Sequence, residues 1–200
     1  MTSLLLVRHG QIKANLQGLW HGSTDSPLTW RGRRQASRTA RHIDRLDPGV
    51  TAIYTSPLGR CVETAGKIGK RLKIDPVVSD NLREYAIGEW EGLPFRVLAE
   101  EYDFVNKSTR NPEFAPPGGE SLTQVAARIV PALQEIHTRH ALDHQVLIVC
   151  HGAATAIALG SLIDGDPKHW INYQFANCGL TELVLSPSPY VNFFNSTHHL

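Results

Sequence analysis

The sequence predicts an α/β fold, a three-layer sandwich whose largely parallel central sheet is flanked by helices on both faces. Two observations support this prediction. Apolar segments of strand length alternate along the chain with amphipathic segments of helix length. The first strand, Ser3–Val7, is nearly continuously apolar, as a parallel strand covered on both faces must be. We expect one domain over residues 1–200, in which 81–120 form a lid-like loop and helix insertion.

The composition is that of an ordinary globular protein. A chain of 200 residues fits one domain, with 42% hydrophobic and 20% charged residues and a net charge of +1. Its three cysteines are widely spaced and form no CxxC motif, which indicates reduced thiols. No run approaches the roughly 20 apolar residues of a membrane span, and MTSLLLV does not resemble a signal peptide. We therefore expect a cytoplasmic protein with no membrane partner.

Two helices and a strand are expected before residue 80. Thr29 is a suitable cap for a helix that runs to about Leu46, and a short strand follows at Ala52–Tyr54. Ser56 followed by Pro57 predicts the start of a second helix, which runs to about Leu72. The expected inward faces of these helices are Ala36, Ala40, Ile43 and Leu46 in the first, and Val62, Ala65, Ile68 and Leu72 in the second.

The second half of the chain alternates in the same way after the insertion. Residues 81–120 are rich in Gly, Pro, Trp and Glu, and PEFAPPGGES is a loop. A long amphipathic helix begins at Ser121, and Pro131 is expected to kink or divide it. The remaining expected elements are a strand at Val146–Cys150, a helix at Ala153–Ile163, and strands at Thr181–Leu185 and Tyr190–Phe194.

Two of the expected strands end in the same way, with a histidine followed by a glycine. VRHG occupies 7–10 and VCHG occupies 149–152, while TSPLGR at 55–60 puts an arginine on the first turn of a helix. Ligands of open α/β sheets bind beyond the carboxyl ends of the strands. If these strands are neighbours, the side chains that converge are Arg8, His9, Arg60 and His151. Guanidinium groups match phosphate oxygens, so the sequence predicts a phosphate-binding pocket.

Two other interpretations of these residues are weaker. A metal site built from His9, His21 and His151 is disfavoured because no histidine pair has helical ligand spacing and two arginines would repel the cation. Cys150, next to His151, is expected to be a buried small hydrophobe, since nothing in its strand position would lower its pKa.

The motifs together identify a family. VRHG, Asn15, DSPLTxxGxxQA at 25–36, SPLxR at 56–60, LREYxxGxWEG at 82–92, PPGGES at 116–121 and VCHG occur in this order. The sequence resembles the histidine phosphatase superfamily, in the branch that also contains cofactor-dependent phosphoglycerate mutases. The resemblance extends over nearly the whole chain, to the closing FFNSTHHL.

The resemblance implies a covalent mechanism. His9 would attack phosphorus as a neutral imidazole, a form that the neighbouring arginine charges favour, and water would release the phosphoryl group. Glu84 matches the acid that protonates the leaving oxygen. The residues that would hold the non-bridging oxygens are Arg8, Asn15, Arg60 and His151. Gly152, within VCHG, and Gly22, in the GLWHGSTD segment, are assigned to substrate binding, and no metal or other cofactor is expected.

Four residues in or near the motifs allow two interpretations or depart from the family pattern. Ile12 stands where the family usually has Ser or Thr, so a hydroxyl near the phosphate is missing. His21 either contacts substrate or makes a hydrogen bond within its loop. Tyr85 and Trp90 either shape the pocket or hold their loop to the core.

An arginine stripe on the first helix suggests a basic surface. Arg31, Arg34, Arg38, Arg41 and Arg45 recur at spacings of three and four. The stripe could bind nucleic acid or an acidic partner, but a solvated helix face is the more frequent explanation. The balanced total charge favours the solvated face, so no nucleic-acid partner is expected.

Three functions are compatible with the motifs. The favoured one is a metal-independent phosphomonoesterase acting on small phosphorylated metabolites. The alternatives are a phosphoglycerate mutase, whose known members are longer, and a non-catalytic phospholigand-binding scaffold, which would need no acid beside a nucleophile. Sugar phosphates, phosphoserine and α-ribazole phosphate all remain open as substrates. The oligomeric state is open as well, with a homodimer as one alternative.

Overall fold

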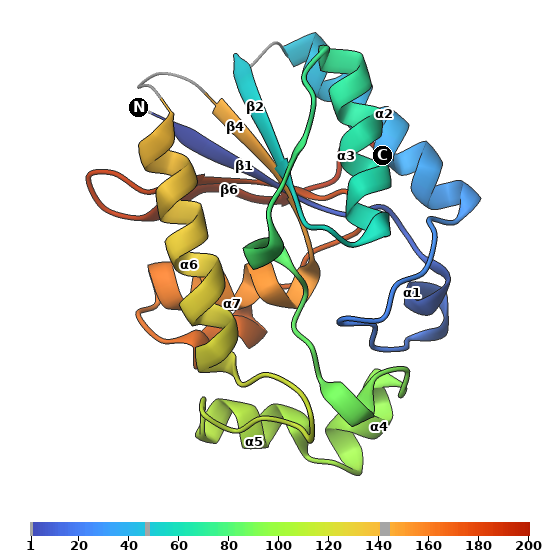
Figure 1. Ribbon diagram of the computed structural model, residues 1–200, viewed down its shortest axis with the longest axis vertical. Coiled ribbons are helices and arrows are strands. Elements are labelled where there is room, and N and C mark those ends of the chain that lie inside the picture. The colour runs from blue at the N-terminus through green and yellow to red at the C-terminus, as the bar shows by residue number, and fades with distance from the viewer. Residues whose placement is uncertain (1, 47–48, 141–144) are drawn as a thin grey trace.

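The computed structural model describes residues 2–46, 49–140 and 145–200 and contains a six-stranded sheet between two layers of helices (Figure 1). The strand order is β3-β2-β4-β1-β5-β6. Strands β1 to β4 are parallel, β5 is antiparallel to β1, and β6 is antiparallel to β5. This confirms the predicted three-layer α/β fold. The strands are β1 Ser3–Arg8, β2 Val50–Thr55, β3 Val77–Val78, β4 Gln145–Cys150, β5 Leu180–Val184 and β6 Tyr190–Ser196.

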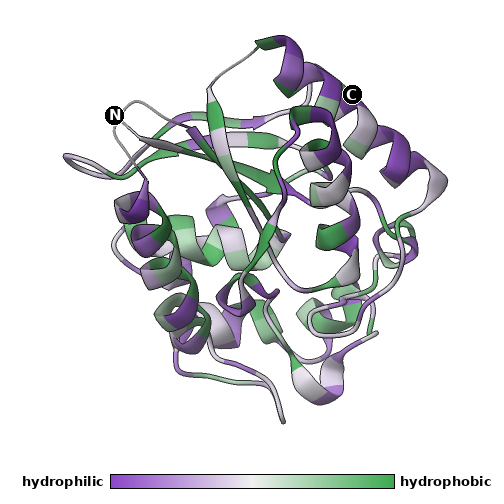
Figure 2. Cartoon of the chain, turned by 45° about the horizontal axis from the view of Figure 1, so that its top comes forward, coloured by the Kyte–Doolittle hydropathy of each residue, from purple (hydrophilic) through white to green (hydrophobic). Residues whose placement is uncertain are grey.

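The sheet is covered on both faces because alternate residues of β1 enter different cores. Leu4 and Leu6 belong to the core under α6 and α7, whereas Leu5 and Val7 belong to the core under α2 and α3. Figure 2 shows the strands mostly green and the outer helix α2 largely purple. The longer helices are α2 Trp30–Leu46, α3 Gly59–Leu72, α6 Leu122–Arg139 and α7 Gly152–Ile163.

Helix α2 begins and packs as the sequence predicts, except at its end. The Thr29 hydroxyl accepts a hydrogen bond from the Gly32 amide at 3.0 Å, which confirms the expected cap. Ile43 is buried, but Leu46 is 63% exposed, so its assignment to the inward face is wrong. At 3.6 residues per turn, Leu46 is rotated by about 80° from Ala36, which places it beyond the edge of the buried stripe.

Helix α3 differs from its prediction in its start and in one face residue. It begins at Gly59 rather than Pro57, and the Ser56 hydroxyl does not cap it but binds a histidine, as described below. Val62 is 41% exposed, whereas Cys61 is fully buried. The inward stripe therefore begins at Cys61. A face chosen from large aliphatic residues passes over cysteine, although both choices fit helical spacing.

Helix α6 is continuous. The Ser121 hydroxyl accepts from the Gln124 amide, and the Gln124 side chain accepts from the Ser121 amide, so a capping box fixes the first turn. Pro131 lies inside the helix, and the division of the helix at this residue, one of the two predicted outcomes, does not occur. Pro131 is on the exposed side, where water can take the place of the lost backbone partner.

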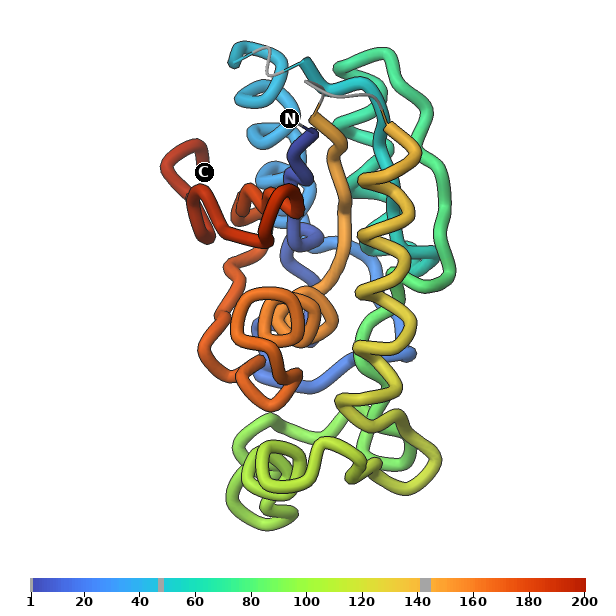
Figure 3. The backbone as a smooth tube through the Cα atoms, turned by 90° about the vertical axis from the view of Figure 1, so that its left-hand side faces the viewer, coloured from blue at the N-terminus to red at the C-terminus, as the bar shows by residue number. Residues whose placement is uncertain are grey.

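The insertion lies beyond the carboxyl ends of the strands and packs on the same core (Figure 3). Tyr85, Leu98 and Phe104 are fully buried together with residues of α6 and α7. This shared core supports our proposal that 1–200 form one domain. The short helices, most of which the sequence did not predict, are α1 Lys13–Gln17, η1 Asp80–Leu82, η2 Gly88–Trp90, α4 Phe95–Glu100, α5 Phe104–Arg110 and η3 Pro167–Asn172.

None of the helices in the described ranges is both long and apolar enough to cross a membrane. The buried thiols also follow expectation: Cys61, Cys150 and Cys178 are all unpaired, and burial raises the pKa of Cys150 to about 11.

Candidate active site

The predicted residues meet because three parallel strands end side by side. Arg8 is paired with Cys150 in the register of β1 and β4, and the His9 amide donates to the Cys150 carbonyl at 3.0 Å. The Ser56 amide, after β2, donates to the Val149 carbonyl at 3.1 Å. The rings of His9 and His151 consequently lie edge to face with their centroids 5.3 Å apart.

His9 is held in the tautomer that a nucleophile needs. Its Nδ1 lies 2.8 Å from the Gly10 carbonyl oxygen, which can only accept a hydrogen bond, so Nδ1 carries the proton. The other ring nitrogen, Nε2, therefore has a free electron pair. The His9 side chain lines the cavity described below although the residue is only 3% exposed.

The surroundings also keep the His9 ring uncharged. Burial lowers the pKa of His9 well below its ordinary value, and the charges of Arg8 and Arg60 lower it further. Positive charge, the cause expected from the sequence, is therefore the smaller contribution. Burial is the larger cause, and no local sequence pattern shows it.

His151 lies fully buried behind His9 and has partners of its own. Its Nε2 forms a 2.7 Å hydrogen bond with the Ser56 hydroxyl, and the Cys61 sulfur lies 3.4 Å from the same nitrogen. Burial lowers the pKa of His151 well below its ordinary value, followed by the charges of nearby groups, Arg60 first. Ser56 was expected only as a helix cap, so its contact with His151 is a role that sequence reasoning missed.

Arg8 reaches into the cavity across a glycine. One terminal nitrogen of its guanidinium donates to the Phe175 carbonyl, while its buried Nε has no hydrogen-bond partner among the described residues. A Cβ atom on Gly152 would lie 3.3 Å from Arg8 Nε, which is tighter than ordinary packing. The glycine of VCHG thus leaves the space that the guanidinium occupies.

Arg60 is buried and bound to the protein itself. Its guanidinium donates to the carbonyls of His21, Gly22 and Thr24 at 2.8–3.1 Å. It also donates to the Asp25 carboxylate at 3.0 Å. Neither Arg60 nor His151 lines the cavity, so their predicted contacts with substrate oxygens remain predictions.

The 21–25 loop is held from its other side by Glu91, a role that sequence reasoning did not predict. The Glu91 carboxylate accepts hydrogen bonds from the amides of Gly22, Ser23 and Thr24 at 2.9–3.1 Å. Burial alone would raise the pKa of Glu91, but these hydrogen bonds lower it. A Cβ on Gly22 would lie 2.2 Å from the Tyr85 carbonyl oxygen, so only glycine fits this close approach. The sequence signal that could have pointed to Glu91 is its place in the WEG segment of the 82–92 motif.

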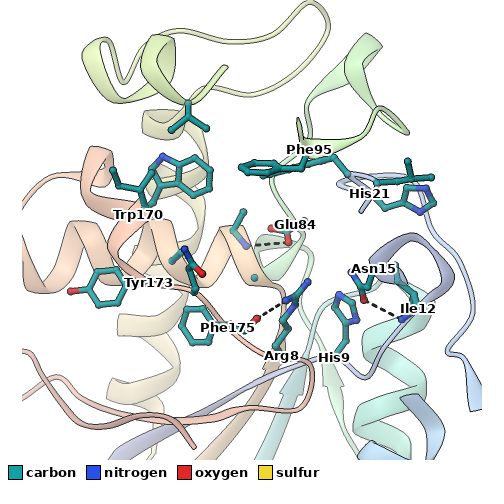
Figure 4. Close-up of a pocket in the computed structure, with 18 residues that line it drawn as sticks. Arg8, His9, Ile12, Asn15, His21, Glu84, Phe95, Trp170, Tyr173 and Phe175 are labelled. Atoms are coloured by element: carbon teal, nitrogen blue, oxygen red, sulfur yellow. Dashed lines mark hydrogen bonds between the residues drawn. The ribbon is translucent and has the colours of Figure 1, made fainter. Parts of the chain in front are cut away.

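Glu84 lies in the cavity at the start of α7 (Figure 4). Its carboxylate accepts from the amides of Ala153 and Ala154 at 3.2 and 2.7 Å, and from the Tyr85 amide at 2.9 Å. Free amides at the start of a helix bind carboxylates well, so α7 fixes the orientation of this side chain. The structure therefore brings the predicted acid and the predicted nucleophile into one cavity.

Asn15 is oriented by a second asparagine. Its Oδ1 accepts from the Ile12 amide at 3.1 Å and from Asn177 Nδ2 at 3.0 Å, and the same Nδ2 donates to the His9 carbonyl at 3.1 Å. With its oxygen occupied, Asn15 offers its amide donors to the cavity that it lines. Asn177 lies in none of the motifs found in the sequence, so sequence reasoning missed its role.

The remaining residues of uncertain role divide between cavity and core. His21 lines the cavity, and its buried Nδ1 has no hydrogen-bond partner among the described residues. Ile12 is 1% exposed and also lines the cavity, so no hydroxyl replaces the missing one. Tyr85 is fully buried outside the cavity, and Trp90 packs against Tyr102, which favours the core role for both.

The cavity has a volume of about 540 Å³, within the roughly 300–1,000 Å³ typical of ligand pockets. Within the described ranges, no group of three or more His, Cys, Asp or Glu side chains is arranged to hold a metal ion. Positive charge at the site comes from Arg8 and Arg60 instead. The arrangement combines a free imidazole nitrogen, a carboxyl group and donors for an oxyanion.

Comparison with known proteins gives three kinds of match. Residues 4–192 match the family described as histidine phosphatase superfamily (branch 1). An uncharacterized phosphatase PhoE of Bacillus subtilis is 34% identical over 168 residues, 84% of this chain and 81% of that protein. A probable phosphoglycerate mutase GpmB of Cronobacter sakazakii is 30% identical over 197 residues, 96% of this chain and 88% of that protein.

A solved structure also matches over nearly the whole chain. The mycobacterial glucosyl-3-phosphoglycerate phosphatase complexed with VO3 superimposes with a TM-score of 0.86 at 29% identity, over 98% of this chain and 99% of that one. The chain also spans 55% of the length of three mycobacterial relatives that are 30% identical to it. The motifs, the sheet topology and the match over residues 4–192 agree: this chain belongs to the histidine phosphatase superfamily, branch 1.

Proposed function

We propose that this phosphatase hydrolyses small phosphate monoesters by way of a phosphohistidine on His9, without a metal ion. The observation that carries the proposal is the tautomer of His9. Its Nδ1 proton is committed to the Gly10 carbonyl, and its Nε2 electron pair is free at the edge of the cavity. An uncharged imidazole with one free nitrogen is the form that attacks phosphorus.

The first step forms a bond between His9 Nε2 and phosphorus and breaks the ester bond. Arg8 and the amide of Asn15 stabilise the non-bridging oxygens, and the Glu84 carboxyl group gives a proton to the leaving oxygen. Both Arg8 and Asn15 line the cavity, which supports this assignment. Arg60, by its positive charge, and His151, as a neutral hydrogen-bonding ring, are assigned to the same phosphoryl group, although neither lines the cavity.

The second step reverses the roles. Water attacks phosphorus, Glu84 takes the proton of that water, and the phosphorus–nitrogen bond breaks to regenerate neutral His9. The product is inorganic phosphate. The relative that acts on glucosyl-3-phosphoglycerate supports a small phosphorylated metabolite as substrate.

A second candidate, phosphoglycerate mutase activity, is favoured only by the names of relatives such as the Cronobacter protein. It would use the same phosphohistidine but return the phosphoryl group to a bound product rather than to water. Measuring inorganic phosphate against transfer to glycerate distinguishes the two activities.

The test is to trap the intermediate. Brief exposure to a ³²P-labelled phosphate monoester and quenching in base should give an adduct on His9 that is stable in base and lost in acid. His9→Ala should abolish the adduct and the turnover, whereas His137→Ala, on the far helix α6, should retain both. Near-normal turnover in His9→Ala would contradict the proposal.

A further inference from the structure

The cavity has a charged end and an apolar wall. Three of the lining residues, Arg8, His9 and Glu84, lie together at the strand ends (Figure 4). The figure shows Phe95, Trp170 and Phe175 around the rest of the opening. The apolar wall comprises these three rings together with Trp20 and Ile171.

This wall is continuous although its residues come from distant segments. Trp20 stacks on Phe95 of α4 with ring centroids 6.0 Å apart, and its other edge meets Trp170 of η3 at 6.3 Å. The Trp20 indole nitrogen donates to the Tyr85 carbonyl, so the ring is fixed. A rigid aromatic surface is thus already formed on the side of the cavity away from the catalytic groups.

Two residues of the wall are exposed to solvent. Phe95 is 43% exposed and Ile171 is 48% exposed, and they belong to different elements that border one cavity. Single exposed apolar side chains are common, but several around one cleft mark a binding surface. A ligand that covers this surface gains hydrophobic free energy in proportion to the apolar area removed from water.

The wall offers no fixed positive charge to a second anionic group. Among the described lining residues, Arg8 is the only arginine and no lysine is present, and one Arg8 nitrogen is already bound to the Phe175 carbonyl. The polar lining residues His21 and Gln174 offer hydrogen bonds rather than a permanent cation. A carboxylate on the leaving group would therefore lose water without gaining an ionic partner.

We infer that the preferred substrates are phosphate monoesters whose leaving group is apolar and uncharged, such as an arylalkyl alcohol, and not carboxylated metabolites. This inference rests on the proposed phosphatase function and specifies its substrate class. Phe95 and Ile171 are the specificity-determining residues, because they supply exposed apolar area at the wall and carry no group that takes part in the proposed chemistry.

The test compares esters of primary alcohols, so that the leaving oxygens are similarly basic. We expect kcat/KM for 2-phenylethyl phosphate to exceed that for O-phosphoserine and for glycerol 3-phosphate at least tenfold. Phe95→Ala should lower the ratio between 2-phenylethyl phosphate and glycerol 3-phosphate about tenfold, and Ile171→Ser should lower it in the same direction. The matched control is Phe193→Ala in β6, where a 38% exposed phenylalanine lies outside the cavity; its ratio should equal that of the unsubstituted protein.

The possible outcomes distinguish an error in the substrate class from an error in the proposed function. A ratio below ten, a preference for phosphoserine, or a Phe95→Ala ratio equal to that of the control would overturn the substrate class and leave the phosphatase function standing. Release of no phosphate from any ester, including p-nitrophenyl phosphate, would overturn the proposed function and the substrate class with it.

Discussion

Mild acid should destabilise the protein through its two buried active-site histidines. His9 and His151 are 3% and 0% exposed, and burial with neighbouring charges holds both pKa values well below the ordinary value of 6.5. The folded state therefore binds fewer protons at these two rings at pH 5.5 than the unfolded chain does. Because the unfolded state binds more protons, the free energy of unfolding falls as the pH is lowered through 6.5.

The magnitude follows from the proton linkage of each ring. Between pH 7.5 and 5.5, a histidine with an unfolded pKa of about 6.5 that stays neutral when folded costs about 1.4 kcal/mol of stability. Two such residues together cost about 2.7 kcal/mol. That loss is a large fraction of the roughly 5–15 kcal/mol by which proteins are stable.

Urea unfolding at pH 7.5 and 5.5 measures this loss, and replacing His9 isolates one half of it. His9→Asn removes one titrating ring, so its stability should fall by about 1.4 kcal/mol less than that of the unsubstituted protein over the same interval. Other groups, such as His199 with its pKa lowered to about 4 by burial and by His42, contribute equally to both proteins. The same pH-dependent loss in both proteins would refute the argument, because it would mean that His9 takes up its proton in the folded state.

Two further predictions concern the chemistry. Glu84→Gln should slow the single-turnover burst on alkyl phosphates by about 10²-fold or more, and that on p-nitrophenyl phosphate far less, because the aryl leaving group needs no proton. Arg60→Ala should slow both alike, since it serves the shared phosphoryl group; equal losses in Glu84→Gln would assign the acid to another residue, Glu89 or Glu91 first. Turnover should survive exhaustive treatment with EDTA because guanidinium groups supply the positive charge. Its loss on chelation and recovery with a divalent ion would contradict the mechanism.

The parts of the molecule that the sequence predicts well are those that local patterns determine. Continuous apolar strands, helical periodicity and the Ser121 cap each depend on neighbours a few residues away. The convergence of His9 with His151 also follows, because parallel strands bring their carboxyl ends to one edge. Leu46 and Val62 were wrongly assigned to the inward faces of their helices. The buried face of a helix has a finite width, and it can include small residues such as Cys61.

The parts that sequence reasoning missed depend on contacts between distant segments. Ser56 meets His151 95 positions away, and Glu91 binds the amides of a loop 67–69 positions before it. Asn177 reaches His9 across 168 positions. Such pairs leave no periodicity in the sequence. The direction of the Arg60 side chain also depends on contacts between distant segments. The local sequence does not decide whether such an arginine points toward a ligand or toward loop carbonyls.

The fixed indole of Trp20 has a consequence for following the protein in solution. Trp20 and Trp170 both border the cavity, and two of the four tryptophans of the chain thus report on its occupancy by their intrinsic fluorescence. An unlabelled ester that settles on the aromatic wall would change their emission within the time of mixing, before any bond is broken. Trp30, which is 73% exposed, supplies a constant background that a phenylalanine substitution would remove. The chain therefore carries its own optical probe of binding, separable in time from the phosphate release that marks turnover.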